Sequence, residues 1–130
     1  IYARTGGVSE SIIDTLNKLS PDHQVEVKDA HGNGVKECKQ LLDKALKGEL
    51  DVNFLEGMGC VGGCVGGPKV VVDKEIGREN VNRYGDEAQF KTPLDSPCVM
   101  KVLRMIGIDS IKELKEDNEK SGIFLRDLHN

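Results

Sequence analysis

The chain has 130 residues, a length typical of one domain. Its 31% charged and 38% hydrophobic residues exclude a disordered chain, and it has no apolar run approaching the roughly 20 residues of a membrane span. A net charge of −4 and only 4% aromatic residues, with no Trp, argue against a nucleic-acid or anionic-membrane surface. We therefore expect a cytoplasmic protein with neither nucleic acid nor membrane as its partner.

The N-terminal region predicts a helix. The chain begins at Ile1 rather than Met, and residues 1–7 resemble the interior of a domain, so we expect a fragment of a longer protein. Apolar residues then recur at helical spacing over residues 8–19. Ser9 is the predicted N-cap, and Pro21 follows the end of the helix.

The next segments predict a β-α-β unit. Residues 24–29 alternate polar and β-branched residues as a strand does, and residues 31–34 have the composition of a turn. An amphipathic helix is expected over residues 33–48, and a second strand over 51–56. The predicted fold class is therefore α/β, with a parallel β-α-β core flanked by helices, and residues 1–130 are read as one domain fragment.

The second half of the chain predicts three helices. A short helix is expected over residues 78–90, and a second begins at Asp95-Ser96-Pro97 and ends at Gly107. Ser110 and Glu113 have the spacing of a capping box and predict the start of a third helix. The buried face of the second helix is expected to comprise Val99, Val102, Leu103 and Ile106.

Residues 57–68 form a glycine-rich segment directly after the second predicted strand. Six of the eleven residues from Gly57 to Gly67 are glycine, which disfavours both helix and strand. Such a backbone can approach a bulky group closely and can direct N–H groups at an anion, and phosphates and iron–sulfur clusters are common guests. In open parallel sheets, ligands bind beyond the carboxyl ends of strands, where this segment lies.

Two thiols in this segment favour an iron–sulfur cluster. Cys60 and Cys64 lie four residues apart, and no phosphate-binding P-loop or dinucleotide-binding glycine pattern is present. Zinc prefers closer cysteine pairs together with a second pair of ligands, and a disulfide between the two thiols is the simplest structural alternative. Because a four-iron cubane needs four cysteines, the missing ligands would come from outside this chain.

The motif FLEGMGCVGGCVGG resembles the M-A-C-P-G-G-C signature of the iron-only hydrogenase large subunit. Two flanking segments are also similar to the family: residues 5–12 (TGGVSESI), and residues 25–42, which match its strand, glycine turn and helix. The resemblance covers residues 1 to about 68 well and the remainder loosely. It implies that the chain is the C-terminal part of a larger hydrogenase catalytic domain.

The resemblance also implies a cofactor and its ligands. The family's H-cluster joins a 4Fe–4S cubane to a two-iron site and exchanges electrons with ferredoxin in reversible proton reduction. By position, Cys60 would ligate the cubane, Cys64 would ligate it and bridge to the two-iron site, and Met58 would lie beside the two irons. The cofactor would be surrounded by the backbone of Gly59, Gly62 and Gly63. The other cubane cysteines belong to motifs upstream of Ile1, so the partners would be the N-terminal part of the same domain and ferredoxin.

Departures from the family pattern leave alternatives open. Val61 replaces the family's Pro, Gly59 its Ala, and the G-G-G-Q-P tail is shortened to residues 66–68. These changes are compatible with a non-catalytic electron-transfer or redox-sensing module on the same scaffold. A zinc- or phosphate-binding module is the third hypothesis.

The remaining candidate residues are interpreted as structural. Cys38 lies on the apolar stripe of its helix and is expected to be a buried, inert thiol, and Cys98 is expected to have no chemical role. His31 is expected to be a solvated turn residue. Glu56 ends the second strand, where we expect a carboxylate at the rim rather than a proton relay.

Overall fold

The computed structural model describes residues 1–21, 25–116 and 122. The chain divides into two compact units, Ile1–Thr92 and Pro93–Asn130, which are described separately. In the part that the structure describes, no helix is both long and apolar enough to cross a membrane.

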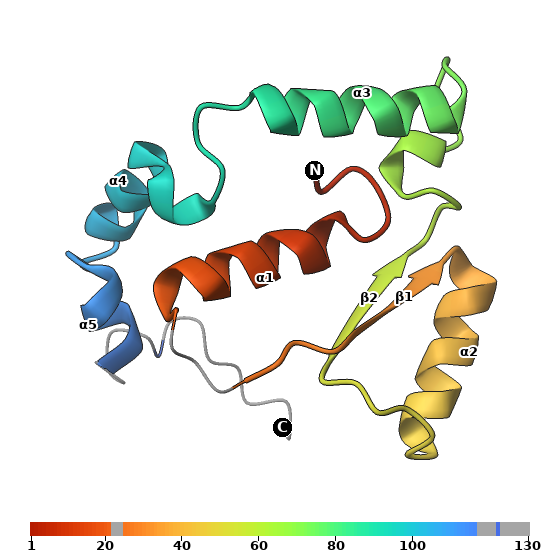
Figure 1. Ribbon diagram of the computed structural model, residues 1–130, viewed down its shortest axis with the longest axis horizontal. Helices are drawn as coiled ribbons and strands as arrows, with labels where there is room; N and C mark the ends of the chain where they lie inside the picture. Colours follow the sequence, from red (N-terminus) through yellow and green to blue (C-terminus); the bar gives the residue numbers. More distant parts are fainter. Residues whose placement is uncertain (22–24, 117–121, 123–130) are drawn as a thin grey trace. The chain divides into compact units, whose positions relative to one another are not determined.

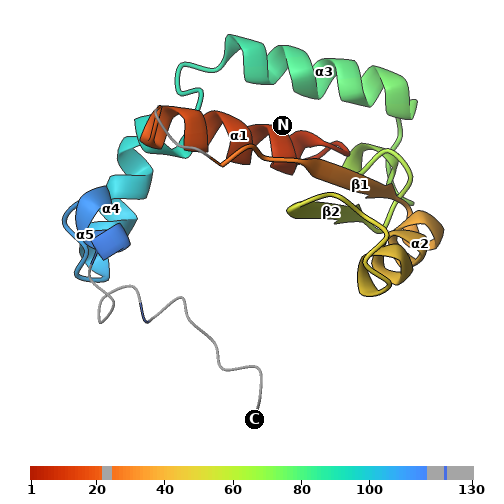
Figure 2. The same cartoon turned by 60° about the horizontal axis from the view of Figure 1, so that its bottom comes forward.

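The first unit is built around a two-stranded parallel sheet. Strands β1 (Asp29–Asn33) and β2 (Phe54–Met58) pair in parallel, and helix α2 (Val35–Leu46) connects them. Helices α1 (Gly7–Leu19) and α2 lie on opposite faces of the sheet (Figures 1 and 2). The predicted α/β class and the parallel β-α-β core are therefore confirmed. Helix α1 begins one residue before its predicted range, and α2 lies inside its predicted range.

Both strands lie further along the chain than predicted. β1 begins at Asp29, and the expected turn residues 31–33 belong to the strand. The backbone of residues 26–28 is bonded instead by the side chain of Asn53, which accepts from the Lys28 N–H (2.9 Å) and donates to the Glu26 carbonyl (2.8 Å). Residue 24, the start of the predicted strand, lies outside the described residues.

Glycines explain why the strands lie where they do. Gly32 pairs with Gly57 in the sheet register, and Cys38 of α2 packs over both residues. A Cβ on Gly32 would lie 2.8 Å from the Cys38 Cα, a distance that real side chains do not tolerate. The helix therefore packs on this part of the sheet only because two opposed residues lack side chains.

Helix α3 (Lys74–Glu87) completes the first unit and begins four residues earlier than predicted. Asp73 caps it by accepting the Glu75 N–H at 2.8 Å, and this cap sets the start of the helix. Gly77 packs against Val65 of the short 3₁₀ helix η1 (Cys64–Gly66). Tyr84 of this helix is 80% exposed.

The second unit contains the 3₁₀ turn η2 (Pro93–Asp95) and helices α4 (Pro97–Met105) and α5 (Ile111–Glu116). Ser96 is the N-cap of α4 and Gly107, at φ 84°, follows its end, so both predicted boundaries are confirmed. The Glu113 N–H donates to the Ser110 hydroxyl at 3.1 Å, which confirms the cap of α5. The predicted buried face of α4 is confirmed only at Leu103, since Val102 and Ile106 are exposed.

Candidate functional site

The glycine-rich segment leaves the carboxyl end of β2 and turns back sharply. Gly62 and Gly63 adopt consecutive left-handed conformations, with φ of 94° and 85°, which favour glycine over any residue with a side chain. A Cβ on Gly66 would lie only 1.9 Å from the Val61 carbonyl oxygen. The tight turn that carries the two cysteines therefore depends on these glycines.

Asn33 and the N-terminal segment hold this turn. The Asn33 Oδ1 atom accepts the Gly62 N–H at 2.6 Å and the Thr5 hydroxyl at 3.0 Å. The Thr5 N–H donates to the Gly62 carbonyl at 3.2 Å, and the Val65 N–H to the Ala3 carbonyl at 3.0 Å. Several of the N–H groups that the sequence suggested would face an anionic guest are therefore bonded to protein oxygens, and the segment has a defined conformation.

The two thiols of the segment are free. Cys60 is half-buried at the start of the turn, whereas Cys64 is exposed at the first position of η1. They are not joined as a disulfide. Gly59, directly before Cys60, has open space around its Cβ position, with no atom within 4 Å.

Met58 has a fixed backbone two residues before the first thiol. It is the last residue of β2 and pairs with Asn33 in the sheet. Its carbonyl accepts the Gly34 N–H at 2.8 Å and the Cys38 thiol at 3.4 Å. Cys38 is half-buried rather than buried, and its bonds to strand carbonyls fit the structural role expected for it.

The donor set suits half of an iron–sulfur site. Thiolate sulfur is the usual ligand of iron–sulfur clusters, and Cys60 and Cys64 supply two such groups. Within the described residues, no three or more His, Cys, Asp or Glu side chains come together as a metal site. A zinc site, like a four-iron cubane, would need ligands besides these two thiols.

Glu56 is buried, so its interpretation as a rim carboxylate is wrong. Only 5% of the residue is exposed, and it accepts the Gly6 N–H (2.9 Å), the Ser9 N–H (2.9 Å) and the Ser9 hydroxyl (2.7 Å). Burial alone would raise the pKa of Glu56. The hydrogen bonds from Ser9 and Gly6, with the nearby His31, outweigh burial and hold the pKa below its ordinary value.

This carboxylate, rather than Ser9, caps α1. The N-cap position is taken by Gly6, at φ 83°, which has no side chain to offer, and Ser9 is 1% exposed inside the helix. His31 lies in β1 rather than in a turn, but it is exposed, as expected of a solvated residue. Its Nε2 atom lies 3.0 Å from the Ser9 hydroxyl and 2.7 Å from Asp29 Oδ2, so it links β1 to α1.

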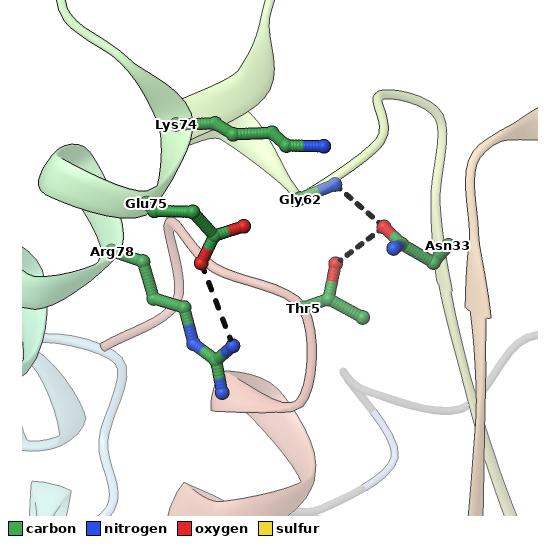
Figure 3. Close-up of a pocket in the computed structure, with 6 residues that line it drawn as sticks. All are labelled: Thr5, Asn33, Gly62, Lys74, Glu75 and Arg78. Atoms are coloured by element: carbon green, nitrogen blue, oxygen red, sulfur yellow. Dashed lines mark hydrogen bonds and ion pairs between the residues drawn. The ribbon is translucent and has the colours of Figure 1, made fainter.

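A polar cavity of about 230 Å³ lies beside the thiol-bearing turn (Figure 3). Its walls come from the N-terminal segment, the end of β1, the turn and the first turns of α3. The lining residues are Thr5, Asn33, Gly62, Lys74, Glu75 and Arg78. Of these, the sequence predicted only Gly62 as a site residue, because the others are brought together by contacts between distant segments.

A known family matches the part of the chain that carries this turn. The model of the C-terminal domain of the iron-only hydrogenase large subunit matches residues 1–68, which is just over half of the 130-residue chain. No individual curated protein matches the chain. The matched range contains the sheet, both of its flanking helices, and the whole turn that carries Cys60 and Cys64.

Proposed function

The chain belongs to the family defined by the C-terminal domain of the iron-only hydrogenase large subunit, and we propose that it forms half of the family's iron–sulfur site. In this proposal Cys60 and Cys64 are two of the four thiolate ligands of a 4Fe–4S cluster. The observation that carries it is the pair of free thiols on a glycine turn at the carboxyl end of a parallel strand. The turn lies within the matched residues and is held in place by Asn33 and Thr5.

The complete site would be that of a hydrogenase-like oxidoreductase. When bound, the cluster and its two-iron site supply the electron exchange for reversible H₂ oxidation, with ferredoxin as the electron partner. Cys64 would bridge the cubane and the two-iron site, and Met58 would line the two-iron side. Gly59, Gly62 and Gly63 would let the backbone approach the cofactor without intervening side chains.

The remaining two ligands would come from cysteines outside this chain, in the N-terminal part of the same domain. The chain has four cysteines in all. Cys38 donates to strand carbonyls on the face of the sheet covered by α2, and Cys98 belongs to the second unit. Neither thiol joins the other two in a ligand group among the described residues.

A second candidate is a non-catalytic electron-transfer or redox-sensing module with the same cluster ligands. It is favoured by Val61, which is 52% exposed where the family has Pro, and by the shortened tail after the second thiol. Both changes affect the side on which the two-iron site would lie and leave the two thiols intact. Hydrogen uptake by the matured full-length protein separates the candidates, because only the first predicts turnover.

Anaerobic reconstitution with iron and sulfide tests the proposed ligand set. The 130-residue chain alone should not hold a stoichiometric four-iron cluster, because it supplies two thiolates where four are needed. The full-length protein, with its upstream cysteines, should hold one. A stable four-iron cluster on the isolated chain that survives Cys60→Ser would contradict the proposal.

A further inference from the structure

Lys74 lies beside the turn that carries the two thiols. It is the first residue of α3, and its aliphatic stem covers two glycines of the turn. A Cβ on Gly62 would lie 3.7 Å from the Lys74 Cδ, and one on Gly66 would lie 3.8 Å from the Lys74 Cβ. The ammonium group extends into the cavity on the side of Gly62 (Figure 3).

The charges around this cavity do not balance. Arg78 is paired with Glu75, at 4.0 Å, so these two charges largely offset each other. Asp73, the other acidic residue at the start of α3, accepts the Glu75 backbone N–H as the helix cap. Among the described residues Lys74 has no acidic partner, and Asp73 does not line the cavity. The lining residues Lys74, Arg78 and Glu75 therefore leave one positive charge beside the thiol-bearing turn.

We propose that Lys74 is the charge partner of the anionic group held by Cys60 and Cys64. The inference rests on the proposed function, since it is the cluster with its thiolate ligands that makes the group anionic. A nearby positive charge favours the more negative, reduced state of such a group and so raises its reduction potential. Lys74 acts through its electric field and is not itself a ligand.

The field of Lys74 is measurable on the 130-residue chain without any cluster. Iodoacetate and iodoacetamide both alkylate a thiolate, which attacks the CH₂ carbon and displaces iodide, but only iodoacetate carries a negative charge. The ratio of the two rates at Cys64 therefore reports the local potential and is independent of the fraction of thiolate. Peptide mass spectrometry measures both rates at this exposed thiol.

Lys74→Gln should lower the iodoacetate-to-iodoacetamide ratio at Cys64 by about two-fold, the effect of one unit charge over several ångströms in a water-like dielectric. The difference in this ratio between wild type and Lys74→Gln should become smaller as salt is added. Lys74→Arg should keep the wild-type ratio. Lys39→Gln is the matched control, because Lys39 is exposed on α2 and does not line the cavity. An equal ratio in wild type and Lys74→Gln would overturn the inference.

A second measurement distinguishes failure of this inference from failure of the proposed function. In cluster-loaded full-length protein, an EPR-monitored redox titration should give a more negative reduction potential for Lys74→Gln and restore it in Lys74→Arg. An unchanged potential with iron bound would refute the role of Lys74 and leave the ligand assignment standing. Iron binding that does not depend on Cys60 and Cys64 would refute the proposed function and this inference with it.

Discussion

The carboxylate of Glu56 should be a principal source of stability in the first unit. It is buried and accepts three hydrogen bonds from the start of α1, at 2.7 to 2.9 Å. In Glu56→Gln one oxygen remains, while the new NH₂ group faces either the Gly6 N–H or the Ser9 N–H, donor against donor. Loss of one or two charge-assisted bonds predicts a fall of about 2–3 kcal/mol in the free energy of unfolding at pH 7.

The effect should depend on pH in a defined direction. The folded-state pKa of Glu56 lies below its ordinary value, so the folded protein binds the proton less readily than the unfolded chain. The stabilisation is therefore complete above the unfolded pKa of about 4.3 and is lost as pH falls through the folded pKa. The difference between wild type and Glu56→Gln should be largest near neutrality and should shrink in acid.

Urea unfolding followed by circular dichroism at pH 7 and in acid measures both effects. Glu49→Gln is the matched control, because Glu49 is an exposed carboxylate in the loop between α2 and β2. The control should stay within about 0.5 kcal/mol of wild type. If Glu56→Gln behaved like the control at pH 7, the account of Glu56 as the cap of α1 would be refuted.

Two further substitutions test the packing around the site. Asn33→Ala removes the acceptor of the Gly62 N–H, so amide exchange at Gly62, measured by NMR, should accelerate and stability should fall by about 1–2 kcal/mol. Asn33→Asp, which keeps an acceptor, should retain slow exchange, and slow exchange in Asn33→Ala would show that the contact does not hold the turn. Gly32→Ala drives a Cβ against the backbone of Cys38 and should cost about 2 kcal/mol or more. Gly59→Ala has open space and is its control, so equal denaturation midpoints for the two variants would contradict the close packing of α2 on the sheet.

The order of elements was predictable because its signals are local. The amphipathic pattern of α2 and the cap and glycine stop of α4 each act within a few residues of the boundary that they set. The glycine and cysteine motif was recognisable for the same reason, since all of its members lie in residues 57–68. The family match over residues 1–68 confirms the family that this motif and its flanks indicated.

The features that could not be predicted depend on contacts between distant segments. Glu56 is buried through its contacts with Gly6 and Ser9. These partners lie 50 and 47 residues earlier in the chain, so no local pattern indicates the contacts. Asn33 reaches Gly62 across 29 residues, so a residue assigned to a turn became the support of the candidate site. The position of β1 was likewise set by the packing of Cys38 over a glycine rather than by the β-branched residues before it.

The central claim, that Cys60 and Cys64 are the cluster ligands of this chain, is tested most directly by two double variants. Both Cys60→Ser/Cys64→Ser and Cys38→Ser/Cys98→Ser remove two of the four thiols, so they differ only in which pair is lost. Iron and acid-labile sulfide are measured after anaerobic reconstitution of the full-length protein. The account predicts that the first variant loses the four-iron cluster and the second retains it. Retention of a full cluster by Cys60→Ser/Cys64→Ser would contradict the account.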